Sequence, residues 1–356
     1  MNFFTVLLAV LIFGALIFVH ELGHFLAARA FGIKVYEFSL GMGPRLLWYD
    51  SKKSGIRYKL CMLPIGGYVS MAAEGEDDAA ESDDPHAITN QKPWKRFIVM
   101  AAGGFVNLLV GFILMLAVVI GSAMGSTVVA EHSEELRTEQ TSTAEYGLMP
   151  YDEIISIDGK RVHTMMELDY EIMRRGIEPV EVIVLRDTDK DGKAERVSLT
   201  VTFPTETSSG QTIGTRDFAV FRKEKTPLSV LHDTFYRGVC SIRMVWESLF
   251  DLITGRYGAD AVSGPIGITE TVGETVSYGL FPVLYLVSLI SINLGVVNLM
   301  PLPALDGGRL VFVLIEMIFR KPVPRHIEAS IHTVGIILLL GLSVLVAFVD
   351  VGRIIH

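Results

Sequence analysis

Four apolar stretches of bilayer length constrain this chain more than any other feature of its sequence. Each is about long enough, at 1.5 Å per helical residue, to cross some 30 Å of hydrocarbon. Half of the 356 residues are hydrophobic. The sequence therefore predicts a polytopic α-helical membrane protein with about four transmembrane helices, over roughly 3–28, 97–121, 280–300 and 329–349.

The first stretch is expected to remain as a helix rather than to act as a signal peptide. Arg29 is the first lysine or arginine of the chain, so there is no basic segment ahead of the apolar run, and the run is too long for the apolar core of a signal peptide.

Basic residues near the ends of the stretches predict the topology, because Lys and Arg gather in cytoplasmic loops. They border the loop after the first stretch and the loop before the fourth, at Arg29, Lys34, Lys92, Lys95, Arg96, Arg320, Lys321 and Arg325. Both loops should be cytoplasmic, with the N-terminus and residues 122–279 outside. The net charge of −9 argues against a nucleic-acid partner.

Three ionisable residues, His20, Glu21 and His24, interrupt the first apolar stretch. Positions i and i+4 share a helix face, so the two imidazoles can reach one metal ion while Glu21 lies beside it to carry a proton. The alternative is a pair of histidines that hydrogen-bond between helices. Ionisable groups inside a membrane are expensive, which favours a functional role.

A catalytic zinc needs a third protein ligand, and Asp306 is the best candidate. It follows the third apolar stretch in "NLMPLPALDGG" (298–308). Both stretches run inward and carry their polar residues near the cytoplasmic end, so the histidines and Asp306 are expected at the same depth. Asp306 could instead be a turn or capping residue, and Glu316 is the next candidate ligand.

Two further polar residues, Asn293 and Asn298, lie on the third stretch, where hydrogen bonding between helices is the simple explanation.

The two cysteines, Cys61 and Cys240, fall on opposite sides of the expected topology, which argues against a disulfide framework or a thiolate metal site.

In these motifs the chain resembles the site-2 proteases, which are intramembrane zinc metalloproteases, and in particular the bacterial branch typified by the regulator-of-sigma-E protease. "HELGH" (20–24) is similar to the first zinc motif of that family, "NLMPLPALDGG" to the second, and "AAGGFVN" (101–107) to its small-residue motif. The family has Gly-Pro where this chain has Gly103-Gly104, and Asn107 stays in register.

The resemblance implies that His20, His24 and Asp306 hold Zn²⁺ and that Glu21 handles the proton in peptide hydrolysis. It also implies that Asn298, Asn293 and Asn107 bind the unwound backbone of a transmembrane substrate. The expected substrates are single-pass membrane proteins already trimmed outside, such as anti-sigma factors, or remnants of signal peptides. The expected location is the bacterial inner membrane, in contact with lipid, with the active site near the cytoplasmic side.

Two β-rich regions accompany the helices. Residues 33–70 contain two β-like segments around "DSKKSG", and in the family this is a membrane-associated β-hairpin that could pair with extended substrate; an ordinary cytoplasmic hairpin is the alternative. Residues 126–205 read as an inserted extracytoplasmic α+β domain, and "AEYGLMPYDEIISIDGKRV" resembles a PDZ domain whose groove could take a peptide. The PDZ pattern usually has glycine where Pro150 stands.

One motif resembles a calcium-binding loop but lacks an essential ligand. "DTDKDG" (187–192) imitates the start of an EF-hand, but Ser198 stands where the bidentate glutamate belongs and the flanks read as strands. A hairpin turn is expected there.

The other histidines lack ligand spacing and are interpreted as surface or structural residues: His86, His132, His163, His232, His326, His332 and His356.

Three classes of function each explain some of these features. A polytopic metal transporter would explain histidines in lipid but not Glu21 or the outer domain, and a membrane-anchored PDZ scaffold would explain only that domain. An intramembrane zinc metalloprotease explains all of these features together. The expected organisation is transmembrane helices at 1–30, 96–122, 280–300 and 329–349, a hairpin loop at 31–95, the PDZ-like domain at 126–205, an amphipathic region at 206–279, and the second zinc motif with a cytoplasmic loop at 301–328.

Overall fold

The computed structural model describes residues 3–72, 84–132, 142–187, 193–208, 211–255 and 264–355. The chain divides into two compact units. One comprises Met1–Leu114 and Val245–His356, and the other comprises Met115–Met244. Most of the acidic cluster at 73–84 and most of "DTDKDG" lie outside the described residues.

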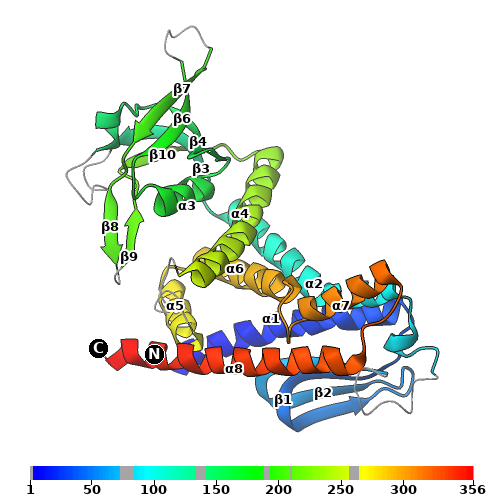
Figure 1. The fold of residues 1–356 in the computed structure, drawn as a ribbon. Helices are drawn as coiled ribbons and strands as arrows, with labels where there is room; N and C mark the ends of the chain where they lie inside the picture. Colours follow the sequence, from blue (N-terminus) through cyan, green and yellow to red (C-terminus); the bar gives the residue numbers. More distant parts are fainter. Residues whose placement is uncertain are drawn as a thin grey trace. The chain divides into compact units, whose positions relative to one another are not determined.

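Among the described residues, four helices are long and apolar enough to cross a membrane, as the sequence predicts. They are α1 (Phe3–Ala30), α2 (Pro93–Gly121), α6 (Leu280–Leu299) and α8 (Arg325–Ile355) (Figure 1). Helix α2 starts four residues before the predicted stretch because Pro93, which lacks a backbone N–H, suits the first position of a helix. Helix α8 extends beyond the predicted stretch at both ends.

Two shorter helices complete the first unit. Helix α5 (Pro265–Ser277) packs against α1, α6 and α8, and α7 (Asp306–Phe319) packs against α6 and α8. The loop between α6 and α7 is short, so Asp306 begins a new helix directly after a membrane span.

An antiparallel hairpin, β1 (Val35–Asp50) and β2 (Arg57–Met71), follows α1, and its second strand packs on that helix. The short 3-10 helix η2 (Ile88–Asn90) then leads to α2. One apolar cluster joins hairpin, η2 and both helices, and its buried members are Ala28, Ile33, Val35, Phe38, Ile56, Val69, Met71, Ile88 and Val99. The predicted hairpin is therefore held against the helix that carries the histidines.

The second unit is built on a sheet with strand order β10-β3-β4-β6-β7. These strands are β3 (Gly125–His132), β4 (Glu153–Ile157), β6 (Val180–Arg186), β7 (Glu195–Val201) and β10 (Phe218–Arg222), with β5 (Lys160–Arg161) paired to β4. Strand β10 pairs with β3, so the sheet extends beyond residue 205, the predicted end of this domain. β10 is short, and a pairing partner about 90 residues earlier leaves no local signal.

The remaining elements of the second unit are η4 (Thr143–Tyr146), α3 (Met165–Arg175), the hairpin β8–β9 (Thr205–Ser208 and Gln211–Gly214) and the first part of α4 (Pro227–Thr254). Thr164 caps α3 by accepting from the Glu167 N–H, and Glu167 accepts in turn from the His163 N–H at 2.8 Å. The core consists of Val129, Leu148, Ile154, Ile157, Val162, Leu168, Ile172, Val180, Val182, Val184, Val201, Phe203 and Phe218.

The turn that resembles the PDZ signature has its unusual backbone at Tyr151. Tyr151 has φ 74°, in the left-handed region that favours glycine. Pro150 cannot adopt such a φ because its ring fixes the angle near −65°. The PDZ pattern usually has glycine at the position of Pro150, and the left-handed residue of this turn is one position later.

Candidate metal centre

Helix α1 presents His20 and His24 on one face, as their i, i+4 spacing predicts. Their Nε2 atoms are 3.2 Å apart. The two side chains are only 12% and 10% exposed. Gly23 allows α2 to approach this face closely, because a Cβ there would lie 2.6 Å from the carbonyl oxygen of Ala102.

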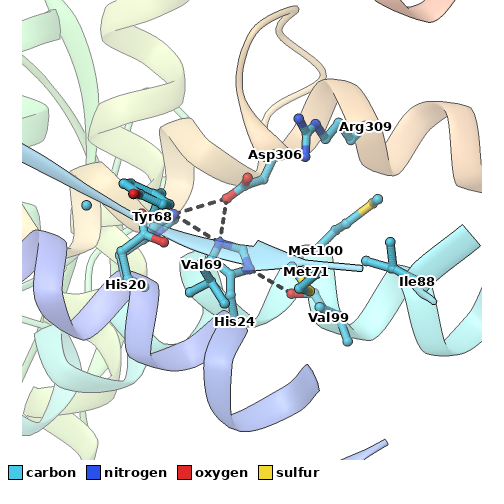
Figure 2. Close-up of a pocket in the computed structure, with 12 residues that line it drawn as sticks. His20, His24, Tyr68, Val69, Met71, Ile88, Val99, Met100, Asp306 and Arg309 are labelled. Carbon is cyan, nitrogen blue, oxygen red and sulfur yellow. Dashed lines mark hydrogen bonds and ion pairs between the residues drawn. The ribbon is translucent and has the colours of Figure 1, made fainter. Parts of the chain in front are cut away.

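The first residue of α7, Asp306, completes the cluster (Figure 2). Its Oδ2 lies 3.1 Å from Nε2 of His20 and 3.1 Å from Nε2 of His24. The glycines that follow it make this placement possible. A Cβ on Gly307 would lie 1.8 Å from the Met300 carbonyl oxygen, and one on Gly308 would lie 2.6 Å from that of Leu302. Only glycine lets the first turn of α7 fold back onto the end of α6.

These three atoms form a nearly equilateral triangle with edges of 3.1–3.2 Å. Ligands about 2.0–2.1 Å from a tetrahedral zinc lie about 3.3 Å from one another, so the triangle matches one face of such a site. Among the described residues this is the one group of three or more His, Cys, Asp or Glu side chains that could share an ion. Two imidazoles and a carboxylate are also ordinary zinc ligands.

The partner of the other His24 nitrogen supports this fit. His24 Nδ1 donates to the Val99 carbonyl oxygen on α2 at 2.8 Å (Figure 2). A carbonyl can only accept, so Nδ1 carries the proton and a neutral His24 turns the lone pair of Nε2 toward the carboxylate oxygen. Two acceptor atoms at 3.1 Å repel each other unless a positive charge lies between them, which a divalent cation provides.

Asn107 approaches His20 in the same way. The Asn107 side chain is fully buried, its Nδ2 is 3.4 Å from His20 Nδ1, and its Oδ1 has no hydrogen-bond partner among the described residues. If Nε2 of His20 faces the metal, Nδ1 carries a proton and needs an acceptor. Exchanging the amide O and N, which are nearly alike in size and shape, would give Nδ1 that acceptor and satisfy Oδ1.

Helix α2 also shapes the site through Gly103. A Cβ at this position would lie 2.3 Å from His24 Nε2 and 2.8 Å from His20 Cε1. At Gly104 a Cβ would instead lie 2.7 Å from Cγ of Leu299 on α6. The two glycines of "AAGGFVN" therefore have separate functions, since one makes room for the imidazoles and the other for helix packing.

The cluster opens into a cavity of about 140 Å³ lined by Glu21 and by part of β2. At Gly67 of β2, a Cβ would lie 2.9 Å from Cγ of Glu21. The strand backbone is therefore held next to the carboxylate that the sequence assigns to proton transfer. The lining residues are His20, Glu21, His24, Gly67, Tyr68, Val69, Met71, Ile88, Val99, Met100, Asp306 and Arg309.

The other predicted site residues are elsewhere. Asn298 is partly buried near the end of α6, Asn293 is exposed on that helix, and neither is among the described residues that line the cavity. Glu316, the alternative ligand, accepts from Nη1 of Arg96 at 2.8 Å. Gly67, Val99 and Arg309 border the site without having been predicted, because a strand backbone, a carbonyl and a lone arginine have no motif.

Comparison with known proteins agrees with this geometry. The family model described as peptidase family M50 matches residues 8–342. The chain is 35% identical to a putative zinc metalloprotease of Clostridium perfringens, over 97% of this chain and 98% of the relative. It is 34% identical to a putative zinc metalloprotease of Nostoc, over 96% and 94%, and 31% identical to the zinc metalloprotease RasP of Geobacillus kaustophilus, over 97% and 97%.

Proposed function

The chain belongs to peptidase family M50, the site-2 protease family, and is an intramembrane zinc metalloprotease; we propose that His20, His24 and Asp306 are its zinc ligands and Glu21 its catalytic base. The observation that carries the assignment is the triangle of ligand atoms with edges of 3.1–3.2 Å, beside a cavity that Glu21 lines. The transporter and scaffold alternatives do not account for the family or for Glu21.

Bound zinc supplies Lewis acidity, which polarises the scissile carbonyl and makes a water molecule more acidic. Glu21 takes a proton from the attacking water as the C–O bond forms, and then returns it to the departing amine nitrogen as the C–N bond breaks. His24, held by Val99, and His20, held by Asn107, keep their Nε2 atoms aimed at the ligand position. For Asn107 we therefore favour this positioning role over contact with substrate.

The proposed substrate is a transmembrane segment in extended form. A helix in lipid has its backbone hydrogen bonds satisfied internally, and unwinding it leaves polar groups that need new partners. Among the described strands, β2 pairs with β1 alone, and its residues Gly67–Val69 line the cavity. An extended substrate that pairs with the free edge of β2 would pass the metal ligands with its backbone satisfied. Asn298 and Asn293 remain candidates for further contact with such a segment.

The second unit is proposed to be a PDZ-like domain on the extracytoplasmic side of the bacterial inner membrane. It excludes substrates whose own outer domains are intact, so that only trimmed proteins, such as anti-sigma factors or signal-peptide remnants, reach the active site. The positive-inside pattern of the loops supports this orientation. Tyr151, which is 75% exposed and stacks on Phe221, is part of the turn that resembles the PDZ signature.

Replacing Glu21 by Gln tests the proposal. The purified Glu21→Gln protein should keep about one zinc per chain and lose about 10²-fold or more of its cleavage of a model transmembrane substrate, because Glu21 is a base and not a ligand. Asp306→Asn is the matched variant, and it should lose both zinc and activity. Turnover at the wild-type rate by Glu21→Gln would refute the mechanism.

A further inference from the structure

The loop that carries Asp306 contains a residue in an unusual conformation. Ala304, two positions before Asp306, has φ 72°. An L-residue with a side chain rarely adopts the left-handed region unless its surroundings hold it there. Whatever fixes Ala304 therefore helps to fix the backbone from which Asp306 reaches the two histidines.

The surroundings in question belong to α8, the fourth candidate span. The backbone N–H of Ala304 donates to Nδ1 of His332 at 3.0 Å. One helical turn later, Gly335 is packed so closely on the loop that a Cβ there would lie 2.4 Å from Cβ of Pro303. One face of α8 thus contacts two consecutive residues of the loop.

His332 is suited to this contact and has little else to bind. Because Nδ1 accepts a backbone N–H, the neutral ring carries its proton on Nε2. Nε2 is buried and has no hydrogen-bond partner among the described residues. The ring lies 5.8 Å from that of Phe312 on α7. The hydrogen bond from the loop backbone to Nδ1 is thus the polar contact that the described residues give this ring, which indicates that the role of His332 is to hold the loop.

We propose that His332 is a positioning residue of the metal centre. It holds the Ala304 N–H, and through the loop it keeps Oδ2 of Asp306 at 3.1 Å from Nε2 of both histidines. The inference rests on the proposed function, since it requires that Asp306 be a zinc ligand. Helix α8, which supplies none of the proposed zinc ligands, would then contribute to the affinity for zinc through His332.

The test compares zinc affinity in purified full-length protein, by competition with a chromophoric chelator and by the visible spectrum of bound Co²⁺. His332→Leu removes the acceptor, and His332→Asn restores one, since asparagine places its Oδ1 close to where Nδ1 was. The zinc affinity of His332→Leu should fall roughly tenfold or more, as when a residue that orients a ligand is removed. His332→Asn should recover most of that loss, and His326→Leu, an exposed histidine on α8, should bind zinc as the wild type does.

The outcomes separate this inference from the function on which it rests. Asp306→Asn with normal zinc affinity would overturn Asp306 as a ligand. If Asp306→Asn loses zinc but His332→Leu does not, or if His332→Asn is as damaged as His332→Leu, the positioning role is overturned. Should His332→Leu fail to fold, His332→Gln replaces it, because its amide lies one carbon farther from the backbone and should not restore the affinity.

Discussion

Gly103 offers the sharpest perturbation of the proposed metal centre, because adding one methyl group there directly affects the atoms proposed as ligands. In Gly103→Ala the new Cβ would lie 2.3 Å from Nε2 of His24 and 2.8 Å from Cε1 of His20. Comfortable contact between such atoms needs about 3.5 Å, so the imidazoles or the helix must shift by about 1 Å. Zinc sites hold their ligand distances to within about 0.2 Å. We expect a loss of zinc affinity of roughly 10–100-fold.

The assay is chelator competition on purified protein, with Gly104→Ala and Gly341→Ala as controls. A Cβ at Gly104 meets Leu299 at 2.7 Å and has no histidine among its nearest atoms, so this variant should lose thermal stability more than zinc affinity. A Cβ at Gly341 meets nothing within 4 Å, so this variant should be unchanged. If Gly103→Ala binds zinc like the wild type, or no worse than Gly104→Ala, the described packing of α2 on the ligands is refuted.

Three other predictions concern Asn107, the second unit and the topology of the chain. Asn107→Leu should lower zinc affinity roughly tenfold while Asn293→Leu leaves it unchanged; equal affinities would remove Asn107 from the site. Deleting 126–221, which takes β10 with its sheet, should permit cleavage of an untrimmed substrate without speeding that of a trimmed one, and unchanged discrimination would exclude the filter. In a variant without Cys61 and Cys240, an impermeant maleimide should label Ser209→Cys in intact spheroplasts but Ser82→Cys only after lysis, and the reverse pattern would invert every span.

Cys240 itself would contribute little to such labelling. It is 1% exposed, and burial raises the pKa of its thiol to about 12. A maleimide reacts with the thiolate, which is scarce at neutral pH for such a group. Ser82 and Ser209 lie outside the described residues, and the sequence around both is polar, so a thiol at either position is expected to react.

The histidine pair and the spans were predictable because they depend on local rules. The i, i+4 spacing puts His20 and His24 on one face of any helix, and hydropathy finds a span without reference to its neighbours. Asp306 needed one more step, an argument from matching membrane depth, and the structure brings its Oδ2 within 3.1 Å of both imidazoles.

What could not be predicted depends on which elements pack together. Nothing in the sequence indicates the contact that His332 makes, because its partner is a backbone N–H 28 positions away, for which no side-chain pattern exists. Val99 is part of the site through its carbonyl, which every residue has. Strand β10 joins the sheet of the second unit through a pairing with β3 that sequence periodicity does not encode.

That pairing also bears on how such a chain could have been assembled. Gly125, where the chain enters the sheet of the second unit, and Arg222, where it leaves, are directly opposite each other in an antiparallel ladder. Their Cα atoms are therefore about 5 Å apart. A module whose two ends meet can be gained, lost, duplicated or exchanged in a gene while the flanking chain stays nearly closed, at little entropic cost. Evolution could thus change the second unit independently of the proposed catalytic residues.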